Sequence, residues 1–112
     1  MAGVDHCVTV ANATAGLELT TQALGLTGEV IVPSWTFVAG PHALARAGTR
    51  PVFADVDPRT HCLDPASVEQ LITEATSGIL AVHLWGRAGA VDELAAIADA
   101  HDLALFYDAA HA

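Results

Sequence analysis

The chain has 112 residues, of which 53% are hydrophobic, and its thirteen acidic and four basic side chains give a formal net charge of −9 at pH 7. This length allows at most one domain. The acidic balance argues against nucleic acid or an anionic membrane as partners, because both require clustered cations, and no apolar run approaches the roughly 20 residues of a membrane span.

The two cysteines, Cys7 and Cys62, fit neither a zinc-binding spacing nor a disulfide framework. We therefore expect free thiols in a reducing compartment. The first residues also lack the basic and then apolar pattern of a secretory signal peptide. Together these features predict a cytoplasmic protein.

Strand-like and helix-like segments alternate along the chain. The strand-like apolar runs cover residues 7–11, 29–32, 51–55, 78–83 and 103–107. Helical spacing of apolar residues appears at 68, 71, 72 and 75 and again at 91, 94, 95 and 98, and Asp64 followed by Pro65 is typical of a helix start. The strands read as continuous apolar runs, which suits strands covered on both faces. The pattern predicts an α/β fold with a mostly parallel sheet and helices on both faces.

In such folds ligands bind beyond the carboxyl ends of the strands, so the residues after each strand are the candidates for a site. The first is the stretch Asn12-Ala-Thr-Ala-Gly, which opens a predicted helix. Its backbone N–H groups and the Thr14 hydroxyl could hold an anion such as phosphate, or the stretch could be a plain N-cap.

Three further strand ends carry aromatic or titratable side chains. Trp35 and Phe37 could lie flat on a planar ligand or pack into the core. Asp55 and Asp57 could form a carboxylate pair for acid–base work or metal binding, although acids in turns are usually solvated. His83 could be a ligand or a structural histidine.

The end of the last strand carries the most specific signal. Asp108 follows the apolar run Leu103–Tyr107, and His111 comes three residues later. A carboxylate in that position needs a cation or hydrogen-bond donors, but the chain has no lysine and its four arginines lie elsewhere. A protonated pyridine nitrogen of a bound cofactor is a suitable partner, because the carboxylate would keep the ring electron-poor.

Four stretches together carry a resemblance: "NATAGLELTTQALGLTGEVIVPSWTFVA", "GTRPVFADVDPRTHCLDP", "VHLWG" and "FYDAAHA". They resemble the DegT/DnrJ/EryC1/StrS family of pyridoxal-phosphate-dependent aminotransferases, which have the type I aminotransferase fold and typically act on nucleotide-linked keto-sugars. The resemblance covers essentially all 112 residues, with the motifs in the family's order and close to its spacing.

The resemblance implies cofactor-binding roles for five residues. Thr14 and Ala15 match the positions that meet the cofactor phosphate, and Phe37 matches the aromatic ring that stacks on the pyridine ring. Asp108 matches the acid paired with the pyridine nitrogen. His111 matches the position whose donor steadies the ring hydroxyl. Trp35 falls at a more variable position, and His83 is assigned only to the pocket wall.

The resemblance also implies that residues 1–112 are part of a large cofactor-binding domain. Family members run to several hundred residues and carry a Schiff-base lysine downstream of the stretch that matches "DAAHA", followed by a small C-terminal domain. This chain has no lysine and hence no catalytic residue of that kind, so it is expected to be inactive by itself. The implied reaction moves an amino group, often from glutamate, to a nucleotide-linked keto-sugar in a family-length homodimer.

Two other interpretations stay open on the sequence. The chain could be a non-catalytic α/β module that binds an anion or a nucleotide at the start of its first helix. Alternatively, His83, Asp108 and His111 could surround a metal, since two histidines and one carboxylate can bind non-haem iron.

Overall fold

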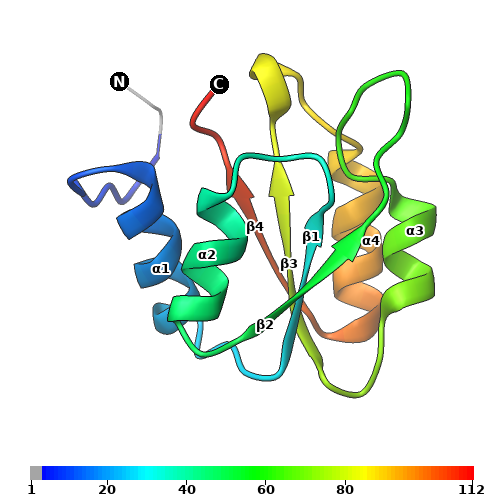
Figure 1. Cartoon of the computed structure of the whole chain (residues 1–112), viewed down its shortest axis with the longest axis horizontal. Helices are drawn as coiled ribbons and strands as arrows, with labels where there is room; N and C mark the ends of the chain where they lie inside the picture. The colour runs from blue at the N-terminus through cyan, green and yellow to red at the C-terminus, as the bar shows by residue number, and fades with distance from the viewer. Residues whose placement is uncertain (1–3) are drawn as a thin grey trace.

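The structure is a computed structural model of the chain and describes residues 4–112. Four strands form one parallel sheet: β1 (Glu29–Pro33), β2 (Arg50–Ala54), β3 (Thr76–Val82) and β4 (Ala104–Asp108) (Figure 1). Their order in the sheet is β2-β1-β3-β4. The chain thus moves outward from β1 to β2 and returns to the other side of β1 for β3 and β4. This confirms the predicted α/β class with a parallel sheet.

Helices cover both faces of the sheet, as predicted (Figure 1). On one face lie α1 (Ala13–Ala23) and α2 (Ala39–Arg46), and on the other lie α3 (Pro65–Leu71) and α4 (Val91–His101). A single 3-10 turn, η1 (Leu84–Gly86), follows β3. No helix among residues 4–112 has the length and apolar character to cross a membrane.

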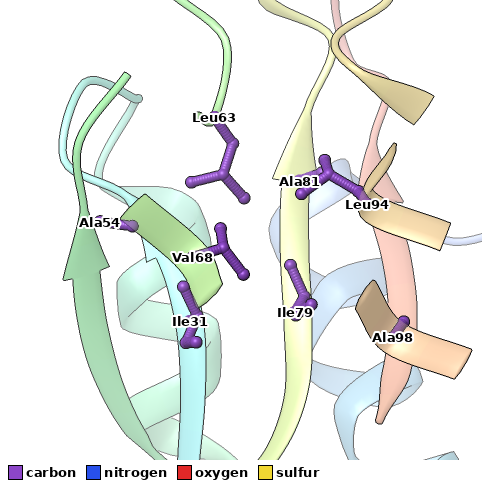
Figure 2. Packing of buried hydrophobic residues seen from close by; sticks show 8 residues of the cluster. All are labelled: Ile31, Ala54, Leu63, Val68, Ile79, Ala81, Leu94 and Ala98. Atoms are coloured by element: carbon purple, nitrogen blue, oxygen red, sulfur yellow. The ribbon is translucent and has the colours of Figure 1, made fainter. Parts of the chain in front are cut away.

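The central strands separate two hydrophobic clusters by the alternation of their side chains. Ile31 of β1 and Ile79 of β3 face α3 and α4, where Val68 and Leu94 complete the larger cluster (Figure 2). The intervening residues face the other way. Val30, Val32 and Leu80 pack against Leu17 of α1 and Leu44 of α2. Burial on both faces explains why β1 and β3 read as continuous apolar runs.

The third helix begins as predicted and ends earlier than the apolar spacing suggests. The Asp64 side chain accepts a hydrogen bond from the Ala66 N–H at 3.1 Å, and Pro65 occupies the first turn. The helix ends at Leu71, although the spacing continues to Ala75. The Thr73 and Thr76 hydroxyls hydrogen-bond to nearby backbone N–H groups there, an alternative to helical bonding that hydroxyl side chains favour.

The predicted strand over residues 7–11 is wrong. Residues 4–11 are exposed, form no strand, and lead directly into α1. Alternating valines favour a strand only when a neighbouring strand supplies hydrogen bonds and packing, and none lies beside this segment among residues 4–112. The sheet therefore has four strands where the sequence suggested five.

Candidate functional site

A pocket of about 200 Å³ opens at the carboxyl ends of β1, β3 and β4. Thr14 lines it from the start of α1, Phe37 from the loop after β1, Val82 from the end of β3, and Asp108 and His111 from the end of the chain. The strand order reverses between β1 and β3, and ligands bind at such a reversal in open α/β sheets. The structure thus brings four of the five predicted cofactor residues to one place.

The fifth residue, Ala15, lies outside this pocket. The Ala15 N–H donates to the Asn12 side-chain oxygen at 2.9 Å, so Asn12 is the N-cap of α1. Ala15 lines a separate polar hollow beside the same helix start, where Thr14 also lies. Thr14 is therefore the first-turn residue that the two hollows share.

Phe37 and Trp35 are not core residues. The structure leaves 72% of Phe37 and 57% of Trp35 exposed, so the core-packing interpretation is wrong for both. Phe37 lines the pocket together with Thr36, which the sequence analysis did not single out. Thr36 could have been found from the sequence, because it lies between two aromatic residues directly after a strand, where ligand-binding residues are expected.

Asp108 is the last residue of β4 and is half-buried. Its Oδ1 accepts a hydrogen bond from the Ala110 N–H at 3.0 Å, and its carbonyl oxygen accepts one from the His83 N–H at 3.0 Å. These two bonds hold the carboxylate at the pocket. Within residues 4–112 the ion pairs involve other acids: Arg46 with Glu18, Arg50 with Glu29, and Arg59 with Asp57.

The backbone of the turn after β3 orients His111. The Trp85 N–H donates to the His111 Nδ1 at 3.3 Å. Because Nδ1 accepts, the neutral imidazole carries its proton on Nε2, which can then donate to an oxygen in the pocket. Trp85 and Gly86 both have positive φ, at 54° and 77°. A Cβ on Gly86 would stand 3.2 Å from the His111 carbonyl oxygen, so a glycine suits this turn.

His83 lies behind the pocket wall. Its neighbours Val82 and Leu84 line the pocket, whereas its own ring stacks on Tyr107, with ring centroids 4.8 Å apart and planes 16° from parallel. The His83 Nδ1 is buried and makes no hydrogen bond among the described residues. Burial raises the pKa of Tyr107, and the nearby charge of Asp92 adds to this effect.

The structure does not support the carboxylate-pair and metal interpretations. Arg59 hydrogen-bonds to Asp57 and lowers the pKa of that carboxyl, which keeps Asp57 ionised and ill suited to giving up a proton. Across residues 4–112, no group of three histidine, cysteine, aspartate or glutamate side chains is placed to hold one metal ion. This removes the geometric basis for iron between His83, Asp108 and His111.

Two curated proteins illustrate the sequence similarity. The L-glutamine:2-deoxy-scyllo-inosose aminotransferase of Streptomyces paromomycinus is 47% identical over 112 residues, which are 98% of this chain and 26% of that protein. The dTDP-4-amino-4,6-dideoxy-D-glucose transaminase of Escherichia coli is 44% identical over 110 residues, which are 98% of this chain and 30% of that protein.

Solved structures agree with this similarity. DesI, in the presence of its TDP-sugar product, is 56% identical and superimposes with a TM-score of 0.93 over 96% of this chain and 28% of its own. NtdA from Bacillus subtilis, with bound cofactor PMP, gives a TM-score of 0.83 at 34% identity over 85% of this chain and 22% of its own. The Escherichia coli GDP-4-keto-6-deoxy-D-mannose-3-dehydratase, with bound hydrated PLP, gives 0.86 at 28% identity over 96% and 30%.

The chain spans less than a third of the length of each of these proteins. The DegT/DnrJ/EryC1/StrS aminotransferase family matches it over residues 1–112. The chain therefore belongs to the DegT/DnrJ/EryC1/StrS aminotransferase family.

Proposed function

We propose that this segment forms the cofactor-binding wall of a pyridoxal-phosphate-dependent sugar aminotransferase, within a protein of family length. The observation that carries the proposal is the pocket at the carboxyl ends of β1, β3 and β4. It gathers Thr14, Phe37, Asp108 and His111, four of the five residues that the family resemblance assigns to the cofactor.

The donors and acceptors around the pocket suit such a cofactor. Asp108 accepts at Oδ1 from the chain itself, and its other oxygen suits a protonated pyridine nitrogen. His111 carries its proton on Nε2 and can donate to the ring hydroxyl. Phe37 is largely exposed and can cover one face of the ring. Because the Ala15 N–H already bonds to Asn12, we assign the Thr14 hydroxyl the larger share of the phosphate contact.

When bound, pyridoxal phosphate supplies the electron-withdrawing ring through which an amino group can be moved. Asp108 holds the proton on the pyridine nitrogen, His111 orients the ring through its hydroxyl, and Phe37 excludes water from one face. This chain has no lysine to link the cofactor covalently, so in a family-length protein the amine that does so comes from another part of the polypeptide.

We infer the substrate class from the relatives. An amino donor such as glutamate or glutamine would supply nitrogen, and a keto-sugar, commonly linked to a nucleotide, would accept it. A dehydratase shares the fold of this segment, which supports the idea that the segment binds the cofactor while residues outside it select the reaction.

The test is to add pyridoxal phosphate to the purified 112-residue chain and record the visible absorption spectrum. We expect weak, non-covalent binding that changes the spectrum beyond what reaction with the N-terminal amine alone produces, and we expect Asp108→Asn to abolish this additional change. Asp55→Asn, directly after β2, is the matched control and should bind as the unchanged chain does. A spectrum identical to that of the free cofactor, or one unaffected by Asp108→Asn, contradicts the proposal.

Borohydride reduction of the same mixture tests whether the chain lacks an internal amine that binds the cofactor covalently. With no lysine in the sequence, mass spectrometry should find the cofactor attached only to the N-terminal amine, and no nitrogen should move from glutamate. A single adduct on an internal peptide, accompanied by amino transfer, would contradict this expectation.

A further inference from the structure

A second hollow, of about 450 Å³, lies beside the cofactor pocket. Its lining residues are Ser34, Trp35, Val56, Pro58 and His61. Trp35 directly precedes Thr36 and Phe37, which line the cofactor pocket, so the loop after β1 contributes to both spaces. The two hollows are therefore neighbours at the carboxyl edge of the sheet.

Two aromatic side chains, Trp35 and His61, line this second hollow, and a third, Trp85, contacts the His61 ring; we call these three residues the aromatic shelf. The His61 and Trp85 rings meet edge to face, with centroids 5.6 Å apart and planes at 61°. Trp35 is 57% exposed and Trp85 is 62% exposed. Large exposed aromatic side chains that gather beside a hollow are typical of a binding surface.

The loops that carry His61 and Trp85 are tied together. Both rise above the carboxyl edge of the sheet (Figure 1). The Arg87 Nη1 donates to the Arg59 carbonyl oxygen at 3.2 Å, and the buried Cys62 Sγ lies 3.7 Å from the Arg87 carbonyl oxygen. These contacts hold the two loops together through two backbone carbonyl oxygens and the buried Cys62, and so keep the His61 ring beside Trp85.

The shelf also holds strained backbone. The residues other than glycine with positive φ among residues 4–112 are His61 at 61°, Trp85 at 54° and Asp102 at 54°. Asp102 caps the end of α4, so the remaining two both lie in the shelf. Such conformations are unfavourable for residues with a side chain and occur most often at active sites and ligand sites. Glycine would fill either position without strain.

The polarity of the hollow favours an uncharged ring with hydroxyl groups. A diphosphate would need cations, but the lining contains no lysine or arginine, and Arg59 beside it pairs with Asp57. Ser34 and His61 offer hydrogen-bonding groups, whereas Trp35 offers a flat apolar face. The position next to the cofactor pocket is where the reacting part of a substrate must lie.

We propose that the aromatic shelf binds the polyhydroxylated six-membered ring of the acceptor substrate. The apolar face of the ring stacks on Trp35, while His61 and Ser34 hydrogen-bond to its hydroxyl groups. Trp85 holds the His61 ring in place. This inference rests on the proposed function, and it assigns the sugar ring, rather than the nucleotide, to this part of the chain.

The two tryptophans are the only ones in the sequence, so their indole N–H signals in a nitrogen-15 NMR spectrum report on the shelf alone. The probes are methyl glucoside and dTDP-glucose for the ring, and thymidine and dTDP for the nucleotide. We expect both ring-containing probes to shift the Trp35 signal, and thymidine and dTDP to leave it unchanged. A response to the nucleotide probes alone, or no response to any probe by a folded chain, overturns the inference.

Variants separate binding from folding. His61→Gly removes the ring and relieves the backbone, so we expect unchanged or higher stability but at least about fivefold weaker binding of methyl glucoside. Phe53→Ala, which removes an exposed aromatic ring from β2, is the matched control and should bind normally. A His61→Gly chain that binds the sugar as tightly as the unchanged chain overturns the inference.

Pyridoxal phosphate absorption, recorded on the same samples, distinguishes this inference from the proposed function. Cofactor binding without a response to the ring probes overturns the shelf alone. A response to the ring probes without cofactor binding overturns the cofactor wall and leaves the sugar site. In a family-length protein, Trp35→Ala should raise the KM for the keto-sugar at least about fivefold with little change in kcat; an unchanged KM overturns the shelf.

Discussion

Polar groups at the amino ends of the strands (the amino edge) bond to one another, whereas those at the carboxyl ends (the carboxyl edge) have few partners within residues 4–112. At the amino edge, Glu29 is buried and pairs with Arg50, and its other carboxylate oxygen accepts from the Thr73 hydroxyl at 2.9 Å. At the carboxyl edge, the only hydrogen bond of the Asp108 carboxylate within residues 4–112 comes from the Ala110 N–H of its own turn, and large parts of Phe37 and Trp35 face solvent.

Backbone geometry makes the same distinction. At the amino edge, the positive φ of Gly28 belongs to a tight turn in which a Cβ would stand 2.4 Å from the Ala75 carbonyl oxygen. Only glycine fits such a close approach. At the carboxyl edge, His61 and Trp85 adopt positive φ although they carry large side chains. At the amino edge a glycine occupies the position that requires one, whereas at the carboxyl edge His61 and Trp85 occupy positions that glycine would fill without strain.

The difference teaches how to separate stability from function in this fold. Groups that satisfy one another contribute to folding, and groups held in place without a partner in the chain are available to a ligand. Substitutions at the amino edge should therefore lower the free energy of unfolding. Substitutions at the carboxyl edge should change binding or chemistry and leave folding nearly unchanged.

The largest expected effect is that of Asp108→Asn in a family-length protein. Asparagine can still accept from the Ala110 N–H, so the turn should persist, but a neutral amide cannot hold the pyridinium proton. We expect transamination to fall at least about a hundredfold, the lower end of what a positioned acid–base group contributes. Single-turnover kinetics measure this. Near-normal turnover would contradict the assignment of Asp108.

At the opposite edge, Glu29→Ala should destabilise the chain by about 1–2 kcal/mol. The loss includes a hydrogen bond from Thr73 in a buried setting, whereas the Arg50 partner is largely exposed and contributes little. Urea unfolding measures the change. Glu29→Gln, which keeps an acceptor for Thr73, should lose less. Weakened cofactor binding by a folded Glu29→Gln chain would break the separation between the two edges.

Phe37→Ala should weaken cofactor binding by about 1 kcal/mol, roughly fivefold, because a stacked aromatic pair contributes about that much beyond area burial. The ring is largely exposed, so the free energy of unfolding without cofactor should hardly change. Spectroscopic titration and urea unfolding measure the two quantities on one sample. A loss of stability of ~3–5 kcal/mol would identify Phe37 as a core residue instead.

The sequence predicted the sheet best where burial decides the structure. The runs in β1 and β3 are apolar on both faces, so the apolar run alone was enough to identify each of them as a buried strand. The run at 7–11 misled because a strand requires a partner strand, which no local pattern reveals. The early end of α3 was missed for a related reason, since hydroxyl side chains at Thr73 and Thr76 compete with helical bonding.

The site was predicted in part. The strand-end rule located Phe37 and Asp108 because each follows an apolar run directly. The engagement of Ala15 by Asn12 was not visible, since a helix start looks the same whether its N–H groups face a ligand or a cap. The contact between His61 and Trp85 joins residues 24 positions apart through two left-handed turns, and nothing in the sequence around either residue announces it.

The smallest expected effect concerns the pKa of Tyr107, a partly buried residue at the carboxyl edge. It precedes Asp108, stacks on His83, and has a raised pKa because it is partly buried and, to a lesser extent, because Asp92 is near. A raised folded-state pKa means that the folded chain holds the phenol proton more tightly than the unfolded chain does. The resulting stability is fully present below the unfolded pKa of about 10 and is lost as the pH rises through the folded value.

Tyr107 is the only tyrosine, so the ultraviolet absorbance of tyrosinate follows this residue alone. Asp92→Asn should lower the apparent pKa of Tyr107 only slightly, because burial is the larger cause. Tyr107→Phe should remove the alkaline loss of stability in urea unfolding. If Asp92→Asn restores the ordinary pKa in full, the aspartate charge and not burial controls the phenol. The raised pKa of Tyr107 would then come from the Asp92 charge and not from packing against His83.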